Sequence, residues 1–242
     1  MSPTAMQDDD HPQLVLPGDR ILYDPSSQKI KIGPGLQQED TLLIGTKLGV
    51  LHKAAGNRWW IDSNQRRYIP ATNENILGIV THRISEGYRV DIGAAQPATL
   101  DQFAFEGATK RNKPNLEVGT LVYAKVTVAN KDMEPEIECL NQSTKKADGY
   151  GEIKGGHLFR VSLAMARSLL DPSSPLLKLL SQSFPFEIAV GMNGRIWINA
   201  AQTIQVITAA NILQKADGKP VDKVEKLIRA ELKQMKERMD VT

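Results

Sequence analysis

The 242-residue chain is poor in cysteine, and Cys139 is the only one. A single cysteine excludes an internal disulfide framework and any metal site built from several cysteines. Chains without disulfides are typical of a reducing compartment, so we expect the cytosol or the nucleus. No apolar run approaches the length of a membrane span. The first residues, MSPTAMQDDDHPQ, lack the basic start and apolar core of a signal peptide.

Net charge and aromatic content are also low. The 30 basic and 28 acidic residues leave a net charge of +2, which is mild for a nucleic-acid-binding protein. Aromatic residues make up 5% of the chain, although stacking aromatics supply much of the affinity of single-strand binders. If this chain binds RNA, its basic residues must be clustered, and the affinity should be low and mainly electrostatic.

Recognisable catalytic motifs are missing. The sequence contains no P-loop, no G-x-S-x-G and no dinucleotide-binding fingerprint. The four histidines lack metal-ligand spacing such as H-x-x-x-H; they are His11, His52, His82 and His157. Three glutamates alternate along one expected strand, which favours a solvated edge over a carboxylate cluster for Mg²⁺; they are Glu134, Glu136 and Glu138. We therefore expect no enzyme activity, no cofactor and no metal.

The chain begins with two stretches of β character. Residues 1–13 are predicted to be a disordered acidic tail, with Asp8 to Asp10 solvated. Residues 14–70 alternate short β-rich runs with turn signals and predict a small N-terminal β-domain. Within it, RWWIDSNQRRYIP reads as two strands around a Ser63-Asn64 turn. Adjacent strand residues face opposite sides, so one of Trp59 and Trp60 should lie in the core and the other could contact a partner.

Residues 71–142 predict a second β-domain. Five short strands are expected, separated by turns, and they read ILGIVTHRI, GYRVDIG, ATLDQ, TLVYAKVTVA and PEIECL. Five strands of this length and spacing match a five-stranded OB-type barrel. The segment that follows, NQSTKKADGYGEIKGG, is polar and contains several glycines, so we interpret it as a linker.

The periodicity changes in residues 148–242. HLFRVS, FEIAV and RIWIN are expected to be strands, while LAMARSLL, PLLKLLSQSF and QTIQVITAANIL are expected to be helices. In VDKVEKLIRAELKQMKERM, apolar residues recur at helical spacing and Pro220 stands at the start, as in a last helix. The fold class is therefore multidomain: two β-domains followed by a mixed α+β domain.

The segment Gly191-Met192-Asn193-Gly194 allows two interpretations. Its glycine spacing resembles the G-x-x-G loop by which KH domains clamp a nucleic-acid backbone. That loop joins two helices, whereas the junction between the expected helices here, LLDPSSPLL, has no glycine, carries Asp171 and lacks two amide donors at its prolines. Asn-Gly between alternating strands is typical of a two-residue type I′ hairpin. We therefore favour a structural hairpin that permits close approach at Gly191 and packs on the barrel.

The strongest basic cluster lies in the loop EGATKRNKPN. Lys110, Arg111 and Lys113 fall within four residues and could neutralise about three phosphates. The alternative is an ordinary solvated loop. Arg83 and Arg89, on the first two barrel strands, are weaker RNA-binding candidates because either could be a surface arginine.

Two stretches, FEGATKRNKPNLEVG (residues 105–119) and VGMNGRIW (residues 190–197), together with the domain order, resemble the RNA exosome cap subunits. Within them the likeness is greatest to the family of ribosomal RNA-processing protein 40, also called exosome component 3. The sibling family of ribosomal RNA-processing protein 4 shares the domain order and an Asn-Gly turn before Ile-Trp, and it is the nearest alternative.

The resemblance implies an S1-type OB RNA-binding domain at 71–142 and a KH-type domain at 148–242. It also implies a non-catalytic cap that guides single-stranded RNA into a ring of RNase PH-like subunits beside other cap subunits. Such a protein takes part in 3′–5′ RNA degradation and rRNA maturation, in the nucleus, nucleolus and cytoplasm, with no membrane partner. Two further hypotheses are a free-standing RNA-processing nuclease and a stand-alone RNA-binding regulator.

Overall fold

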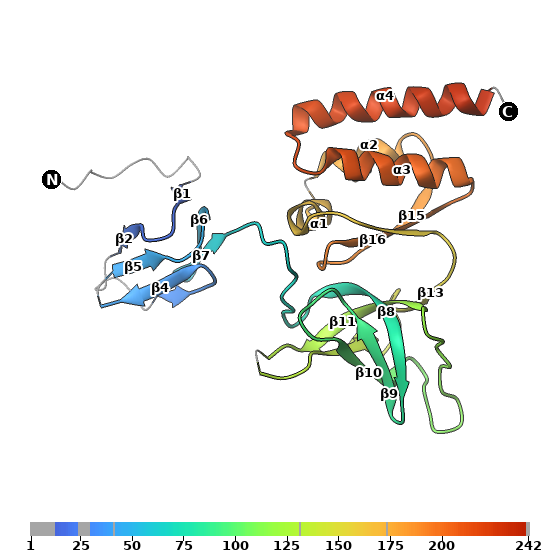
Figure 1. The fold of residues 1–242 in the computed structure, drawn as a ribbon, viewed down its shortest axis with the longest axis horizontal. Helices are drawn as coiled ribbons and strands as arrows, with labels where there is room; N and C mark the ends of the chain where they lie inside the picture. The colour runs from blue at the N-terminus through green and yellow to red at the C-terminus, as the bar shows by residue number, and fades with distance from the viewer. Residues whose placement is uncertain (1–12, 24–29, 41, 131, 173, 241–242) are drawn as a thin grey trace. The chain divides into compact units, whose positions relative to one another are not determined.

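The computed structural model describes residues 13–23, 30–40, 42–130, 132–172 and 174–240 (Figure 1). The predicted tail, including Asp8 to Asp10, lies outside these residues apart from its last position. The chain forms two compact units, residues 1–64 and 65–242. Within the described part, no helix is both long enough and apolar enough to cross a membrane.

The first unit is a small β-domain, as predicted. Strands β1 (Leu14–Val15), β6 (Gly49–Ala54), β7 (Arg58–Asp62) and β3 (Lys31–Ile32) form one sheet in that order. Strands β2 (Arg20–Leu22), β5 (Leu42–Gly45) and β4 (Leu36–Glu39) form a second sheet. Both sheets contribute to one small core, made of Val15, Ile21, Leu36, Leu43, Leu51 and Ile61.

The predicted strand pair around Ser63-Asn64 is wrong in its second half. β7 ends at Asp62, and residues 63–71 form no strand. Tyr68 in this stretch instead packs into the core of the next domain, where its hydroxyl donates to Glu74 Oε2 at 2.6 Å. A tertiary contact with the barrel therefore overrides the local hairpin pattern.

The second unit begins with the predicted barrel. All five expected strands are present: β8 (Asn75–Ile84), β9 (Gly87–Asp91), β10 (Ala98–Phe105), β11 (Leu121–Val128) and β12 (Glu136–Cys139). They pair in the order β12-β10-β9-β8-β11, and β11 also pairs with β12, which closes the barrel. Inward residues such as Ile76, Val90, Leu100, Val122 and Ile137 fill its interior.

The linker prediction needs one correction. Residues Gly151–Ile153 form a further strand, β13, which pairs antiparallel with β11 from Leu121 to Tyr123. The unpaired edge of β11 offers backbone hydrogen bonds, and these are available to any segment with compatible geometry, even a glycine-rich one.

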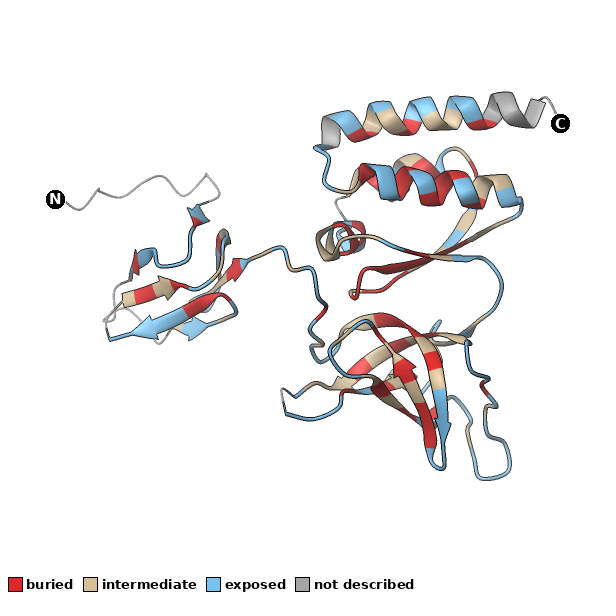
Figure 2. Ribbon diagram, in the orientation of Figure 1, coloured by how far each residue is buried: buried red, intermediate tan, exposed pale blue. Residues whose placement is uncertain are grey.

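The last domain is α+β, and every expected element is present. β14 (His157–Arg160), β16 (Arg195–Ala200) and β15 (Phe186–Val190) form a three-stranded sheet with β16 in the centre. The helices are α1 (Leu163–Leu170), α2 (Pro175–Ser181), α3 (Thr203–Ala216) and α4 (Val221–Asp240). Their apolar faces meet the sheet in one core, and the outer face of α4 is exposed (Figure 2).

Candidate nucleic-acid interface

Residues 191–194 connect β15 to β16, so they form a hairpin loop and not a helix-to-helix junction. The amide of Gly194 donates to Gly191 O at 3.0 Å, and the amide of Gly191 donates to Arg195 O at 2.9 Å. Gly194 has a φ of 74°, whereas Asn193 is not among the residues with positive φ. The predicted two-residue type I′ turn is therefore wrong, and the loop is of the three-residue kind that ends on a positive-φ glycine.

The side chain of Asn193 bonds to the barrel. The Asn193 side chain is 9% exposed, and its amide group donates to Leu77 O at 2.7 Å and to Ile92 O at 2.8 Å. Its Oδ1 accepts from the amide of Leu77 at 3.3 Å. The amide of Met192 adds a bond to Asn75 O at 2.8 Å. The hairpin is thus joined to the barrel through main-chain groups at the start of β8 and just past the end of β9.

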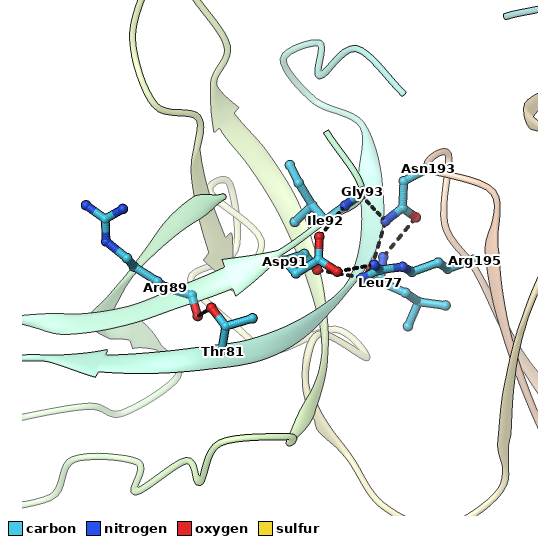
Figure 3. A network of polar contacts seen from close by, with 8 residues as sticks. All are labelled: Leu77, Thr81, Arg89, Asp91, Ile92, Gly93, Asn193 and Arg195. Carbon is cyan, nitrogen blue, oxygen red and sulfur yellow. Dashed lines mark hydrogen bonds and ion pairs between the residues drawn. The ribbon is translucent and has the colours of Figure 1, made fainter. Parts of the chain in front are cut away.

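Arg195 completes this joint, and the sequence did not reveal it. Its side chain is only 2% exposed, and it donates to the backbone and carboxylate oxygens of Asp91, each at 2.5 Å (Figure 3). Burial of Asp91 acts to raise the pKa of its carboxyl. The Gly93 amide and the Arg195 guanidinium outweigh that effect and hold the pKa below its usual range. A buried arginine without this partner would leave an uncompensated charge in the interior.

The two loop glycines are required for different reasons. A Cβ atom on Gly191 would lie 2.8 Å from the backbone nitrogen of Leu77, so its role is close approach to the barrel. A Cβ atom on Gly194 would lie 2.7 Å from Val161 O, in addition to the strain of positive φ. The loop is therefore closely packed on both sides and offers no open nest of amides to a phosphate.

The junction between α1 and α2 is equally unsuited to a backbone clamp. α2 begins at Pro175, which has no amide hydrogen, and Ser174 is its N-cap residue. The Ser174 hydroxyl occupies the capping position but makes no capping hydrogen bond to the helix. Neither the hairpin loop nor the α1–α2 junction therefore presents glycine amides that could bind a phosphate.

The basic loop runs between β10 and β11, at the barrel end away from the hairpin joint. Lys110, Arg111 and Lys113 are all exposed. The loop is anchored beneath them, because the hydroxyl of the buried Tyr88 donates to Pro114 O at 2.5 Å and accepts from the amide of Leu116 at 3.2 Å. Figure 1 shows this loop and the β8–β9 turn at the same, lower end of the barrel. Three cations on an anchored loop form the largest cluster of the predicted RNA-binding residues.

Phe103 is the aromatic residue that this surface offers. Its side chain is 41% exposed on β10, and Lys113 Nζ lies 5.3 Å from the ring centroid. Tyr88, on the neighbouring strand β9, is buried in the barrel core. An exposed ring beside cations is the combination that binds single strands, through stacking and charge together. A phenylalanine in an alternating strand gave no sign from sequence of which face it would occupy.

The structure separates the two predicted strand arginines. Arg83 is exposed and lies opposite Tyr88 in the β8–β9 register, so it belongs to the same barrel end as the loop. Arg89 pairs with Glu134 at 3.2 Å, both side chains being 42% exposed. Figure 3 shows Arg89 pointing away from the hairpin joint. RNA would have to displace a carboxylate to use Arg89, which makes Arg83 the better of the two candidates.

No catalytic constellation is found in the described part of the chain. It contains no group of three or more His, Cys, Asp or Glu side chains placed to hold a metal. Of the alternating glutamates, Glu134 is engaged by Arg89. Burial in the barrel raises the pKa of the Cys139 thiol to about 12, so it remains a thiol at neutral pH.

The Asp91–Arg195 pair predicts a dependence of stability on pH. A carboxyl whose folded-state pKa is depressed contributes stability above its unfolded value of about 3.9, and this contribution is lost as pH falls through the folded-state pKa. We expect wild type to be more stable than Asp91→Asn at pH 6 and the gap to close in acid. Urea unfolding at several pH values measures it, with the exposed Asp132→Asn as control. A gap that stays constant down to pH 3 would contradict the assignment.

Three family models match the chain in sequence order. They are described as "Exosome complex exonuclease Rrp40 N-terminal domain" over residues 30–67, "Exosome complex component RRP40, S1 domain" over residues 68–151 and "KH domain" over residues 156–204. Together they cover most of the first β-domain, the second β-domain and the first part of the α+β domain.

Curated relatives extend this similarity over most of the chain. The chain is 46% identical to exosome complex component rrp40 of Schizosaccharomyces pombe over 203 residues, covering 80% of this chain and 85% of the relative. It is 42% identical to exosome complex component RRP40 of Homo sapiens over 199 residues, covering 79% and 72%. Exosome complex component Rrp4 of Thermococcus kodakarensis is 25% identical over 236 residues, covering 93% and 88%.

One solved structure shares the fold at low identity. It is a crystal structure provisionally described as an exosome complex RNA-binding protein, with a TM-score of 0.58 and 21% identity. The match covers 72% of this chain and 99% of that one. At this identity, the likeness bears on the fold alone.

Proposed function

This chain belongs to the RRP40 family of exosome complex components, and we propose that it is a non-catalytic cap subunit that binds single-stranded RNA and guides it into the complex. The observation that carries the proposal is 36–46% identity to relatives named RRP40, spanning 78–89% of this chain. The Rrp4 relative, at 25%, makes the sibling family the weaker alternative.

RNA contact is assigned to the barrel and not to the KH-type domain. The hairpin that resembles a clamp is occupied by its contacts with Leu77, Ile92 and Asp91. The exposed cations Lys110, Arg111 and Lys113, with Arg83 and Phe103 at the same barrel end, remain accessible to a phosphate backbone and its bases. This surface suits guidance of RNA, because mainly electrostatic contacts hold a strand without fixing its sequence.

The partners in this proposal are a ring of RNase PH-like subunits, the other cap subunits and single-stranded RNA. The expected process is 3′–5′ degradation and processing of RNA, including maturation of rRNA. The expected locations are the nucleus, the nucleolus and the cytoplasm. Co-purification of the tagged chain at native stoichiometry tests the partners, and imaging of the same tag tests the locations.

The purified chain is expected to have no ribonuclease activity in the presence of Mg²⁺. The reason is that the described residues hold no grouped metal ligands. The measurement is degradation of a long single-stranded RNA by the isolated chain and by the assembled complex. Metal-dependent degradation that co-elutes with the isolated chain through repurification would favour the free-standing nuclease. The matching N-terminal family is described as a domain of an exosome complex exonuclease, which is the observation in favour of that alternative.

A further inference from the structure

A groove of about 680 Å³ lies within the second unit, away from the basic loop. Four consecutive residues of β15, Glu187 to Val190, line it. Consecutive residues of a strand point to opposite faces, so a groove that all four of them line follows the strand's edge. The other lining residues come from α1, α2, β11, β16 and the segment around β13.

The edge of β15 in this groove has free hydrogen-bonding groups. β15 is the outer strand of its sheet, and among the described residues only β16 pairs with it. The amide of Gly191 bonds to Arg195 O, and hydrogen-bonded pairs alternate along an antiparallel ladder. Ala189 and Glu187 are therefore bonded to β16. Ile188, between them, directs its N–H and C=O into the groove.

The groove has two unlike walls. On the helix side, Ile188 packs against the domain core, and Leu169, Leu170 and Leu177 complete an apolar wall. Leu170 is 42% exposed there. On the barrel side lie Tyr123 and two oppositely charged residues of the β13 segment, which pair with one another at 3.4 Å: Glu152 and Lys154.

Glu187 adds an exposed carboxylate to the barrel side. It shares a face of the strand with Ala189, two residues along, and Ala189 is paired in the sheet with Trp197. This face is opposite to the one that carries Ile188. Asn199 Nδ2 lies 3.5 Å from Glu187 Oε2, which is a weak contact, so the carboxylate is open to a cation. Two glutamates against one lysine give this groove a negative rim.

We propose that this groove binds an extended segment of a partner protein, which adds to β15 as an edge strand. The partner residue opposite Ile188 exchanges both backbone hydrogen bonds with it and places an aliphatic side chain against Leu170, because opposed residues share a face. Its neighbour in the segment faces Glu187 and is Lys or Arg. RNA does not fit this groove, because Glu152 is paired with Lys154, and the remaining carboxylate of Glu187 and the apolar wall oppose phosphate.

The test measures the binding of capped heptapeptides to the full chain by NMR. The probe is Gly-Thr-Lys-Leu-Lys-Thr-Gly; one control replaces both lysines with glutamate, and the other carries an N-methyl group on the leucine. We expect the probe to shift the Ile188 amide and slow its exchange. The N-methyl peptide should bind about fivefold more weakly, for one lost hydrogen bond. The glutamate peptide should bind about threefold to tenfold more weakly, because an attractive lysine–glutamate contact at the surface becomes a repulsive contact between two glutamates.

Protein variants separate this site from others. Leu170→Ser should weaken binding of the probe. Ile207→Ser should leave this binding unchanged, because it alters a 54% exposed residue on α3 outside the groove. Glu187→Lys should reverse the preference between lysine and glutamate peptides. Equal binding of the N-methyl peptide, no binding at millimolar peptide, or a shift of Ile188 by an oligouridine would each overturn the proposal. None of these outcomes depends on the role of the basic loop in RNA guidance.

Discussion

Replacing Lys110, Arg111 and Lys113 together with glutamate is expected to remove most of the salt-dependent binding of single-stranded RNA and to leave the fold intact. The three side chains are exposed, and the loop is held by Tyr88 and Leu116, which the variant retains. Three phosphate contacts on a single strand give a salt slope of about −2, so wild type should lose about twentyfold in this binding between 50 and 200 mM salt. The variant should lack that loss.

The measurement is RNA crosslinking by the isolated chain, and degradation of a long RNA by the reconstituted complex, at both salt concentrations. The control changes three exposed lysines outside the loop to glutamate, Lys145, Lys146 and Lys219, so that net charge changes equally. If both triple variants crosslink as wild type does at 50 mM salt, the loop is merely solvated and RNA enters over another surface. If both lose binding equally, only overall charge matters.

Alanine at either hairpin glycine is expected to destabilise the second unit. Gly191→Ala forces a Cβ atom against Leu77 N, and overpacking of this kind costs about 1–3 kcal/mol. Gly194→Ala adds a collision with Val161 O to a strained φ, which alone costs about 1–3 kcal/mol. Urea unfolding measures both changes, and RNA crosslinking at matched folded fraction should be unchanged.

Gly218→Ala is the matched control for Gly194→Ala. Gly218 has the same φ of 74°, and a Cβ atom there would meet nothing within 4 Å. The free energy of unfolding lost in Gly218→Ala therefore reports backbone strain alone. The loss in Gly194→Ala should be larger by the cost of the collision with Val161 O. Unchanged unfolding of both hairpin variants, together with weakened RNA crosslinking, would return the clamp interpretation to favour.

Elements with a strong local signal were predictable from sequence. α1 matches the expected LAMARSLL residue for residue, because its apolar spacing, its Ser162 cap and the following Asp-Pro act within one or two turns. The five barrel strands were predictable for the same reason, since each alternates and is bounded by turn residues. β13 was not, because a glycine-rich segment becomes a strand only through the free edge of β11.

The joint between barrel and hairpin could be predicted only in part. The Asn-Gly pair indicates a turn, but the turn is not of type I′, and the side chain of Asn193 bonds Leu77, 116 positions away. Nothing local to Arg195 indicates its partner, because Asp91 lies 104 positions from it. One signal was present: a lone arginine among apolar residues directly after a tight turn needs a carboxylate nearby if it faces inward.

The three bonds of Asn193 all end on main-chain atoms, so the hairpin recognises the barrel much as one strand recognises another. Carbonyl and amide groups are the same in every residue except proline. Substitutions in the side chains of Leu77 or Ile92 therefore leave these three bonds in place, while most substitutions of Asn193 delete them. Variation on the two sides of this joint should accordingly affect these hydrogen bonds unequally, although Leu77 and Ile92 are fully buried and their substitution also changes core packing. Transplanting this hairpin onto another barrel would require main-chain groups at the places of Leu77 and Ile92 and a carboxylate at the place of Asp91.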